Sequence, residues 1–163
     1  GKEAQLLNVW YVNSILGTFR LEEEDNAICG LALCPDGVPE LEPLPRKVCE
    51  TPLLQEAEEQ LNEYFAGARR EFDLPLAPKG TPFQKAVWAE MCRIPYGETR
   101  TYGQLAAAIG RPSACRAVGG ACHCNPIAIL QPCHRVVGST GKLTGYAYGV
   151  EMKQYLLELE QQE

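Results

Sequence analysis

The stretch DLPLAPKGTP at residues 73–82 divides the chain into two regions of different character. Its three prolines and one glycine resist regular secondary structure, which favours a linker. Before it, residues 6–34 carry β-branched and aromatic runs that predict strands, with an acidic turn at residues 22–26. Beyond it, apolar residues recur at helical spacing. We therefore predict an α+β protein, with a small sheet-plus-helix domain at residues 1–78 and a mainly helical domain at residues 79–163.

Threonines mark the expected starts of three helices. Thr51 and Thr81 are each followed by proline, which is favoured in the first turn after a side-chain cap. Thr101 can cap a third helix, and residues 112–124 restart as a fourth with Arg116 near its beginning. Two short helices joined by a turn of glycine and proline are consistent with a helix-turn-helix, although any antiparallel helix pair produces the same pattern.

Two further segments complete the second domain. The apolar run IAIL at residues 127–130 predicts a short buried strand or extended segment that leads to Cys133. The chain ends in an amphipathic helix, whose inward face we expect to hold Val150, Tyr155, Leu156 and Leu159.

The charge distribution is uneven. The whole chain has a net charge of −6, which argues against a nucleic-acid partner. Residues 1–78 hold 6 basic and 15 acidic side chains, whereas residues 79–142 hold 8 basic and 2 acidic ones. The second stretch is therefore a candidate phosphate-binding face, with a chance cluster of solvated charges as the alternative.

Eight cysteines occur in a sequence without an evident leader or a long apolar run. We expect reduced thiols and a cytoplasmic location, or a nuclear one in a eukaryote, with no membrane contact. Cys122-His123-Cys124 resembles a metal cluster but lacks the paired Cys-x-x-Cys spacing of structural zinc sites. We expect these cysteines to pack a helix, and we expect no metal and no other cofactor.

The octapeptide QPCHRVVG at residues 131–138 places Cys133 directly before His134. Neighbours in an extended segment point to opposite faces, so a direct bond between this thiol and this imidazole is awkward. A water could relay the proton instead, and a carboxylate from the last helix could hold the imidazole tautomer. A buried core cysteine beside a structural histidine is the alternative.

The run PCHRVV, with Asn125-Pro126, RAVGGA at residues 116–121 and GY at residues 145–146, closely resembles the O6-alkylguanine-DNA alkyltransferases. The match continues through GTPFQKAVW, IPYGETRTYGQLA and LLELE, and so spans residues 80–160. The resemblance implies direct-reversal DNA repair, in which a methyl or small alkyl group moves irreversibly from O6-alkylguanine to a cysteine. O4-alkylthymine is an open alternative substrate.

The resemblance also implies a role for each matching residue. Cys133 would be the acceptor thiolate, His134 the base acting through water, and Glu160 the carboxylate that orients the imidazole. Asn125 would brace the turn that carries the cysteine. Tyr102 would donate a proton or a hydrogen bond to the departing guanine. The first 78 residues would adopt a ribonuclease-H-like fold, and the rest would form the DNA-binding and alkyl-acceptor domain.

The implied partner is double-stranded DNA with an alkylated guanine, bound through the minor groove by a monomer. The target base would be flipped out of the stack, and Arg116 would fill the space it leaves. Further DNA contacts are implied for Gly103, Arg111, Ser139 and Ala117. The substrate pocket would be walled by Tyr146, Tyr148, Val136 and Gly138.

Two residues depart from the family pattern. Tyr148 stands where some relatives have glycine, so we expect the pocket to exclude bulky groups such as benzyl. Gln131 replaces the usual aliphatic residue, with no effect predicted. Two other functions stay open: an alkyltransferase-like damage-binding protein, which would lack the acceptor cysteine, and a cysteine hydrolase, which would need an oxyanion hole.

Overall fold

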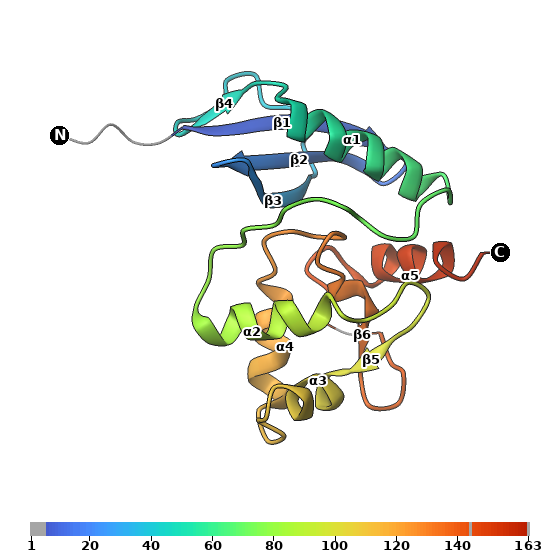
Figure 1. Ribbon diagram of the computed structural model, residues 1–163. Helices are drawn as coiled ribbons and strands as arrows, with labels where there is room; N and C mark the ends of the chain where they lie inside the picture. The colour runs from blue at the N-terminus through green and yellow to red at the C-terminus, as the bar shows by residue number, and fades with distance from the viewer. Residues whose placement is uncertain (1–5, 144, 163) are drawn as a thin grey trace. The chain divides into compact units, whose positions relative to one another are not determined.

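The chain forms two compact units that divide after Pro78 (Figure 1). The computed structural model describes residues 6–143 and 145–162. One unit is a sheet with a helix against it, and the other is built mainly of helices, which confirms the predicted α+β class. Within the described residues, no helix is both long and apolar enough to cross a membrane.

The sheet of the first unit has the strand order β3-β2-β1-β4. Its strands are β1 (Leu7–Ser14), β2 (Gly17–Glu24), β3 (Ala27–Cys34) and β4 (Arg46–Val48). The first three form an antiparallel meander, and β4 runs parallel to β1 at an edge. Asp25 and Asn26 join β2 to β3 with φ angles of 52° and 61°, as a type I′ hairpin turn requires. The turn is therefore confined to Asp25 and Asn26, and the prediction of a turn over residues 22–26 is wrong for residues 22–24, which belong to β2.

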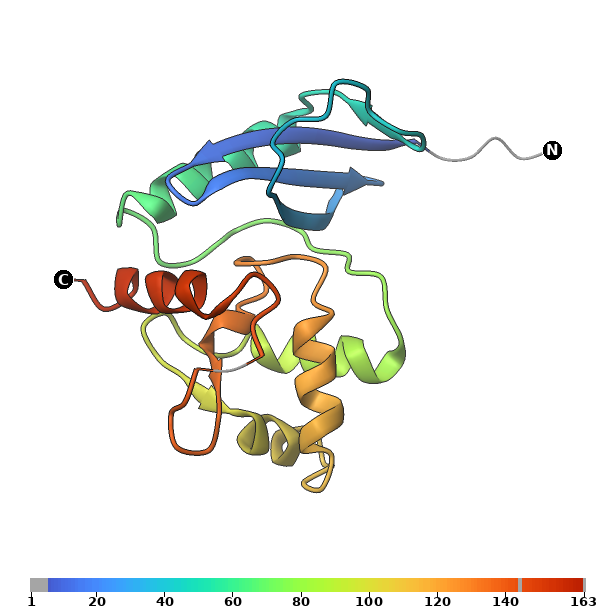
Figure 2. The same cartoon turned by 180° about the vertical axis from the view of Figure 1, so that it is seen from behind.

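Helix α1 (Pro52–Phe65) covers one face of this sheet, as the two opposite views show (Figures 1 and 2). Its predicted cap is confirmed, because the hydroxyl of Thr51 accepts a hydrogen bond from the backbone of Leu54 at 3.1 Å. Phe65 stacks on Phe19 of β2 with ring centroids 6.1 Å apart. The apolar face of α1 and the inward residues of β2 thus form the core of this unit.

The stretch at residues 73–82 is more ordered than a linker composition indicates. Ile28 of β3 donates to the carbonyl of Pro75 and accepts from the backbone of Ala77, each at 2.8 Å. The edge of β3 is therefore covered by the chain that leads out of the first unit.

The second unit contains α2 (Pro82–Met91), α3 (Tyr102–Ala108), α4 (Cys115–His123) and α5 (Val150–Leu159), with the short parallel strands β5 (Arg100–Thr101) and β6 (Val136–Val137). Capping boxes at Thr81 and Thr101 confirm the predicted starts of α2 and α3. Trp88 of α2 is fully buried and donates to the carbonyl of Ala121 at 2.8 Å. This indole bond joins α2 to α4 at the centre of the unit.

Helices α3 and α4 contact each other and both contact α2. Residues 109–114 connect them, and Gly110 has a φ of 77°, which ends α3 in the left-handed conformation that glycine favours. Helix α4 starts without a side-chain cap. The pair has the element order of the predicted helix-turn-helix.

Two local predictions are wrong. Residues 127–130 are buried, as predicted, but form no continuous strand: Ala128 pairs with Gln131 in an isolated bridge, and the chain turns at residues 129 and 130, where Ile129 has a φ of 69°. The backbone of Gln131 donates to the carbonyl of Ile127 at 3.0 Å. On α5 the predicted inward residues Leu156 and Leu159 are buried, but Val150 is 47% exposed, and Lys153, which was not predicted to face inward, is fully buried. Val150 is the first residue of the helix, where it has no preceding turn to pack beside.

Candidate active site

Cys133 begins a short 3-10 helix at residues 133–135, directly after the buried turn of residues 127–130. A φ of 69° is unusual for the β-branched Ile129, and the surrounding hydrogen bonds hold it there. The prediction that Cys133 lies in an extended segment is therefore wrong. In a 3-10 helix, neighbouring side chains diverge by about 120°, so Cys133 and His134 still point in different directions.

The sulfur of Cys133 is enclosed and hydrogen-bonded. The residue is 6% exposed, and Nδ2 of Asn125 donates to its Sγ at 3.2 Å. Burial raises the pKa of the Cys133 thiol, while the hydrogen bond from Asn125 and the positive charge of Lys153 act in the opposite direction. The resting thiol is therefore neutral, in a site that already holds two groups which favour the thiolate.

Asn125 has a fixed amide orientation. Its Oδ1 accepts from the backbone of Ile127 at 3.0 Å, and its Nδ2 donates to the carbonyl of Gln131 at 2.8 Å. A backbone amide only donates and a backbone carbonyl only accepts. These two bonds therefore identify which end of the Asn125 side chain is the oxygen and which is the nitrogen. The NH₂ group therefore faces the sulfur of Cys133.

His134 and Glu160 form a fully buried pair, with Nε2 of the imidazole 2.6 Å from Oε2 of the carboxylate. Burial alone would raise the pKa of Glu160, but hydrogen bonds from His134 and Arg135 lower it to about 2. Glu160 is thus ionised and can only accept, so Nε2 of His134 carries a hydrogen. Burial lowers the pKa of His134, which leaves the ring neutral and its Nδ1 unprotonated.

The unprotonated Nδ1 of His134 is buried and has no hydrogen-bond partner among the residues that the structure describes. Buried polar atoms nearly always have a hydrogen-bond partner. Nδ1 of His134 is therefore able to accept a hydrogen bond from one further donor. A neutral imidazole with its Nε2–H held by a carboxylate and its Nδ1 open is a general base.

Arg135 completes the carboxylate cluster. Its Nε and Nη2 contact the two oxygens of Glu160 at 2.8 and 3.1 Å, and its Nη1 donates to the carbonyl of Ile94 at 2.7 Å. This bidentate pair joins the 3-10 helix to α5 and to the segment after α2. Sequence reasoning missed Arg135, although its place beside the predicted catalytic histidine was a signal.

Lys153 was also missed. It is fully buried on α5, and its Nζ lies 5.8 Å from the ring centroid of Tyr102. Burial lowers the pKa of Lys153, while the nearby thiols of Cys133 and Cys122 act to raise it. A lysine at an inward position of the last helix is the sequence signal that could have found it.

Three tyrosines lie near this site. Tyr146 is 7% exposed, and burial raises the pKa of its hydroxyl, which has no hydrogen-bond partner within the described part of the chain. Its ring contacts that of Tyr148 edge-on, with centroids 5.9 Å apart. A Cβ atom at Gly145 would lie 3.2 Å from the hydroxyl of Tyr102, so that loop passes close to Tyr102.

Comparison with known proteins identifies the family. The DNA binding domain of 6-O-methylguanine DNA methyltransferase matches residues 82–162, and the ribonuclease-like domain of the same family matches residues 9–78. A methylated-DNA–protein-cysteine methyltransferase of Methanosarcina barkeri is 61% identical over 107 residues, which are 66% of this chain and 68% of the relative. The chain belongs to this methyltransferase family.

Other members of the methyltransferase family extend the similarity. The constitutive methylated-DNA–protein-cysteine methyltransferase of Bacillus subtilis is 56% identical over 112 residues, or 68% of either chain. The crystal structure of the Mycobacterium tuberculosis OGT in complex with DNA matches with a TM-score of 0.84 and 42% identity. That match covers 94% of this chain and 92% of the other. Membership therefore rests on both sequence and fold.

The five residues predicted to contact DNA lie on α3, on α4, between these two helices and after β6. Arg116 and Ala117 are exposed in the first turn of α4, and a Cβ atom added at Gly120 would meet nothing within 4 Å. Arg111 is exposed, with its guanidinium 5.6 Å from the ring centroid of Phe83. The remaining two are Gly103, half-buried on α3, and Ser139, exposed after β6.

The remaining pocket residues are placed as follows. Val136 is fully buried in β6, and Gly138 is half-buried where the chain leaves that strand. The backbone of Gly138 donates to the carbonyl of Lys142 at 2.8 Å, which closes the loop after β6. Val136 is thus part of the core, and Gly138 stands at the base of the loop.

The expectation that Cys122 and Cys124 pack a helix holds for Cys122 and is wrong for Cys124. Cys122 is buried against Met91, with the two sulfurs 3.6 Å apart, whereas His123 and Cys124 are exposed. Burial raises the pKa of Cys122 to about 12, as in a packing cysteine. Within residues 6–143 and 145–162, no three His, Cys, Asp or Glu side chains are grouped to hold a metal ion.

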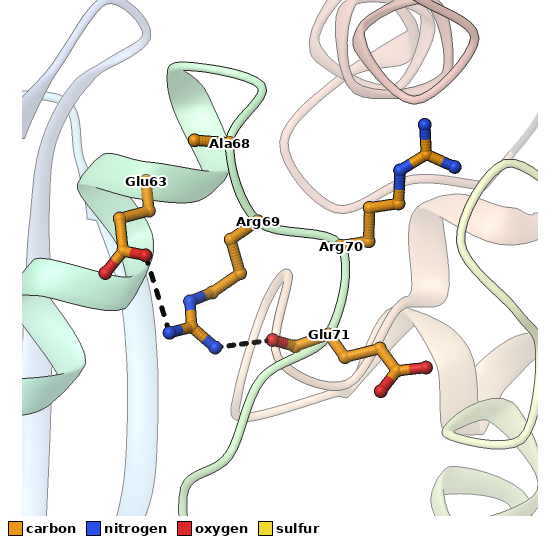
Figure 3. Close-up of a pocket in the computed structure, with 5 residues that line it drawn as sticks. All are labelled: Glu63, Ala68, Arg69, Arg70 and Glu71. Atoms are coloured by element: carbon orange, nitrogen blue, oxygen red, sulfur yellow. Dashed lines mark hydrogen bonds and ion pairs between the residues drawn. The ribbon is translucent and has the colours of Figure 1, made fainter. Parts of the chain in front are cut away.

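A shallow pocket in the first unit is separate from these residues. It is lined by Glu63, Ala68, Arg69, Arg70 and Glu71 (Figure 3). Figure 3 shows Arg69 turned toward Glu63, at 3.4 Å, and toward the backbone carbonyl of Glu71, at 2.9 Å. The charge of Arg69 is therefore already engaged within the pocket wall.

Proposed function

We propose that this protein repairs DNA by transferring a methyl or small alkyl group from O6 of guanine to Cys133, once per molecule. Relatives that are 56–61% identical are named methylated-DNA–protein-cysteine methyltransferases. The observation that most supports the assignment is the joint placement of a donor on the sulfur of Cys133 and an open base on His134. Such an arrangement suits a thiol that must become a thiolate when substrate arrives.

The proposed reaction is an in-line displacement. A water accepts the proton of the Cys133 thiol and gives one of its own protons to Nδ1 of His134, which leaves a thiolate and an imidazolium that Glu160 stabilises. The thiolate attacks the alkyl carbon, a carbon–sulfur bond forms, and the carbon–oxygen bond to guanine breaks with its electron pair moving to the base. Tyr102 would donate a proton or a hydrogen bond to the departing guanine.

The buried position of Cys133 fits a single-use protein. A thioether does not hydrolyse under mild conditions, so the alkyl group would stay on the sulfur. A cysteine hydrolase would release its acyl or alkyl group to water, and a damage-binding relative would not need a reactive cysteine. The presence of Cys133 with its donor and base favours transfer over both.

DNA binding is proposed for the surface around α3 and α4, where Arg111 and Arg116 are exposed. The relative from Mycobacterium tuberculosis has a structure in complex with DNA, and similarity to it spans nearly the whole chain. We propose minor-groove docking of α4, with Arg116 entering the stack and Ala117, Gly103, Arg111 and Ser139 near the backbone. A monomer in the cytoplasm, or in a eukaryotic nucleus, suits this role. The domain after residue 78 would bind DNA and accept the alkyl group, and the first would be ribonuclease-H-like.

Substrate size is proposed to depend on Tyr146 and Tyr148. Their rings contact each other edge-on, directly after Gly145, which lies close to the hydroxyl of Tyr102. Val136 and Gly138 are proposed as further wall residues. A bulky O6-benzyl group would meet the Tyr148 ring. Equal reaction rates with benzylguanine and with a methylated oligonucleotide would refute this part of the proposal.

The test of the function is the stoichiometry of repair on a duplex that contains one O6-methylguanine. The expected result is one lesion removed per protein molecule, with no methanol released. A hydrolase would remove many lesions and release methanol, and a damage-binding protein would remove none.

A further inference from the structure

Gln131 is buried, with 3% of its surface exposed, although glutamine is usually an exposed residue. Its side-chain Nε2 donates to Oδ1 of Asn125 at 2.7 Å. Its backbone carbonyl accepts from Nδ2 of the same asparagine at 2.8 Å. Gln131 therefore contacts both ends of the Asn125 amide, one with its side chain and one with its backbone.

The Asn125 amide is fully used by these contacts. Oδ1 accepts from Gln131 and from the backbone of Ile127, and Nδ2 donates to the carbonyl of Gln131 and to Sγ of Cys133. A donor on the carbonyl oxygen of an amide polarises its NH₂ group and strengthens the bonds that this group donates. The side chain of Gln131 thus acts on the sulfur of Cys133 through one intervening amide.

We infer that Gln131 is a positioning residue, whose side-chain amide holds Asn125 with its NH₂ group directed at the sulfur of Cys133. An aliphatic residue at this position would keep the backbone half of the arrangement and leave Oδ1 of Asn125 with the single donor from Ile127. This positioning of Asn125 explains why the polar side chain of Gln131 is buried. The inference rests on the proposed function, because that function makes Cys133 the reactive group whose thiolate the Asn125 amide stabilises.

The distinguishing variant is Gln131→Met, which keeps the length and apolar stem of the side chain and removes only its amide. The full chain is treated with iodoacetamide over a range of pH, and the rate of modification is read at Cys133 by peptide mass spectrometry. The groups that surround the thiol are the same in both proteins: Lys153 of α5, Cys122 of α4, His134 and Tyr146.

We expect the rate at pH 7.5 to be about two- to fivefold lower in Gln131→Met, with the pH profile displaced toward higher pH and its plateau unchanged. A displaced profile is the signature of a less stable thiolate. A lower plateau with the midpoint unmoved would mean altered access to the sulfur, and an unchanged profile would mean no coupling. Either of these two results overturns the inference.

Gln60 provides the matched control. It is another buried glutamine, whose amide bonds to the backbone of Asp73 at both ends, within the first unit. Gln60→Met should cost stability without moving the pH profile of Cys133. If Gln131→Met does not fold, Gln131→Glu serves instead, because an ionised carboxylate cannot donate to Asn125 and should displace the profile further.

Different results would refute the proposed function and the inference about Gln131. If the protein removes no O6-methylguanine from DNA, the proposed function fails, and the iodoacetamide profile still tests Gln131. If repair occurs and the Gln131→Met profile matches that of the unmodified protein, the inference alone is lost.

Discussion

Nε2 of His134 lies 2.6 Å from Oε2 of Glu160, and both side chains are completely buried. The carboxylate determines the imidazole tautomer, because an ionised oxygen can only accept a hydrogen bond. Glu160 also receives two bonds from Arg135, so one carboxylate holds both the proposed base and a structural cation. Chemistry and stability are therefore linked at this residue.

Glu160→Gln should slow alkyl transfer by about tenfold to a hundredfold, since a neutral amide neither fixes the tautomer nor stabilises the imidazolium. It should also lower the free energy of unfolding by about 3 kcal/mol, because Arg135 keeps a buried charge without its partner. Single-turnover rates on a methylated duplex and urea unfolding measure the two effects. The matched control is Glu158→Gln on the exposed side of α5, and an equal loss of rate there would contradict the assignment.

Stability should fall as the pH drops. The folded-state pKa of Glu160 is lowered to about 2, so its contribution is present above the unfolded value of about 4.3 and is lost as pH falls toward 2. The pKa of His134 is also lowered, so protonation below about 6.5 favours the unfolded chain as well. Urea midpoints measured between pH 7.5 and pH 3 should decline, with a smaller decline in Glu160→Gln. Constant midpoints over this range would be inconsistent with the buried pair.

Lys153→Met should reduce the rate of alkyl transfer at neutral pH by about tenfold, because it removes a buried positive charge that favours the Cys133 thiolate. Stability should be unchanged or slightly higher, since methionine fills a similar volume without a charge to desolvate. The rate should recover at high pH, where the thiol ionises unaided. Lys142→Met in the exposed loop is the control, and a rate loss in Lys153→Met that persists at every pH would point to altered packing instead.

Arg116→Ala should weaken repair of duplex DNA by about tenfold to a hundredfold, since the flipped state loses the side chain that fills the stack. Reaction with free O6-methylguanine base should change much less. Arg116 is exposed, so the free energy of unfolding should stay within about 0.5 kcal/mol. Arg93→Ala, which removes an arginine that is 75% exposed after α2, is the control. Equal losses on duplex and free base would argue against the flipping role.

The sequence was sufficient to predict those features that depend only on interactions between residues close together in the chain. Thr51, Thr81 and Thr101 cap helices because a hydroxyl needs only the backbone amide three residues later. The hairpin at Asp25-Asn26 likewise depends on two adjacent residues that tolerate positive φ. These features set element starts and one turn without any distant contact.

Predictions failed where distant residues decide the outcome. The run at residues 127–130 looks like a strand, but Gln131 and Asn125 bond across it and fold it into turns. Lys153 is buried because α5 packs beside the segment that carries Cys133, twenty residues earlier in the chain. No pattern within a single helix reveals such a neighbour. The proposed active-site residues were predicted from family resemblance, while the contacts that surround them required the structure.

The central claim is that Cys133 receives the alkyl group, and intact mass measures this most directly. After incubation with duplex DNA containing O6-methylguanine, the protein should gain one methylene, about 14 Da, on a peptide that contains Cys133. Cys133→Ser should gain nothing, while Cys124→Ser, which alters an exposed cysteine, should gain the same mass as the unmodified protein. An unchanged mass, or a gain that survives in Cys133→Ser, would contradict the account.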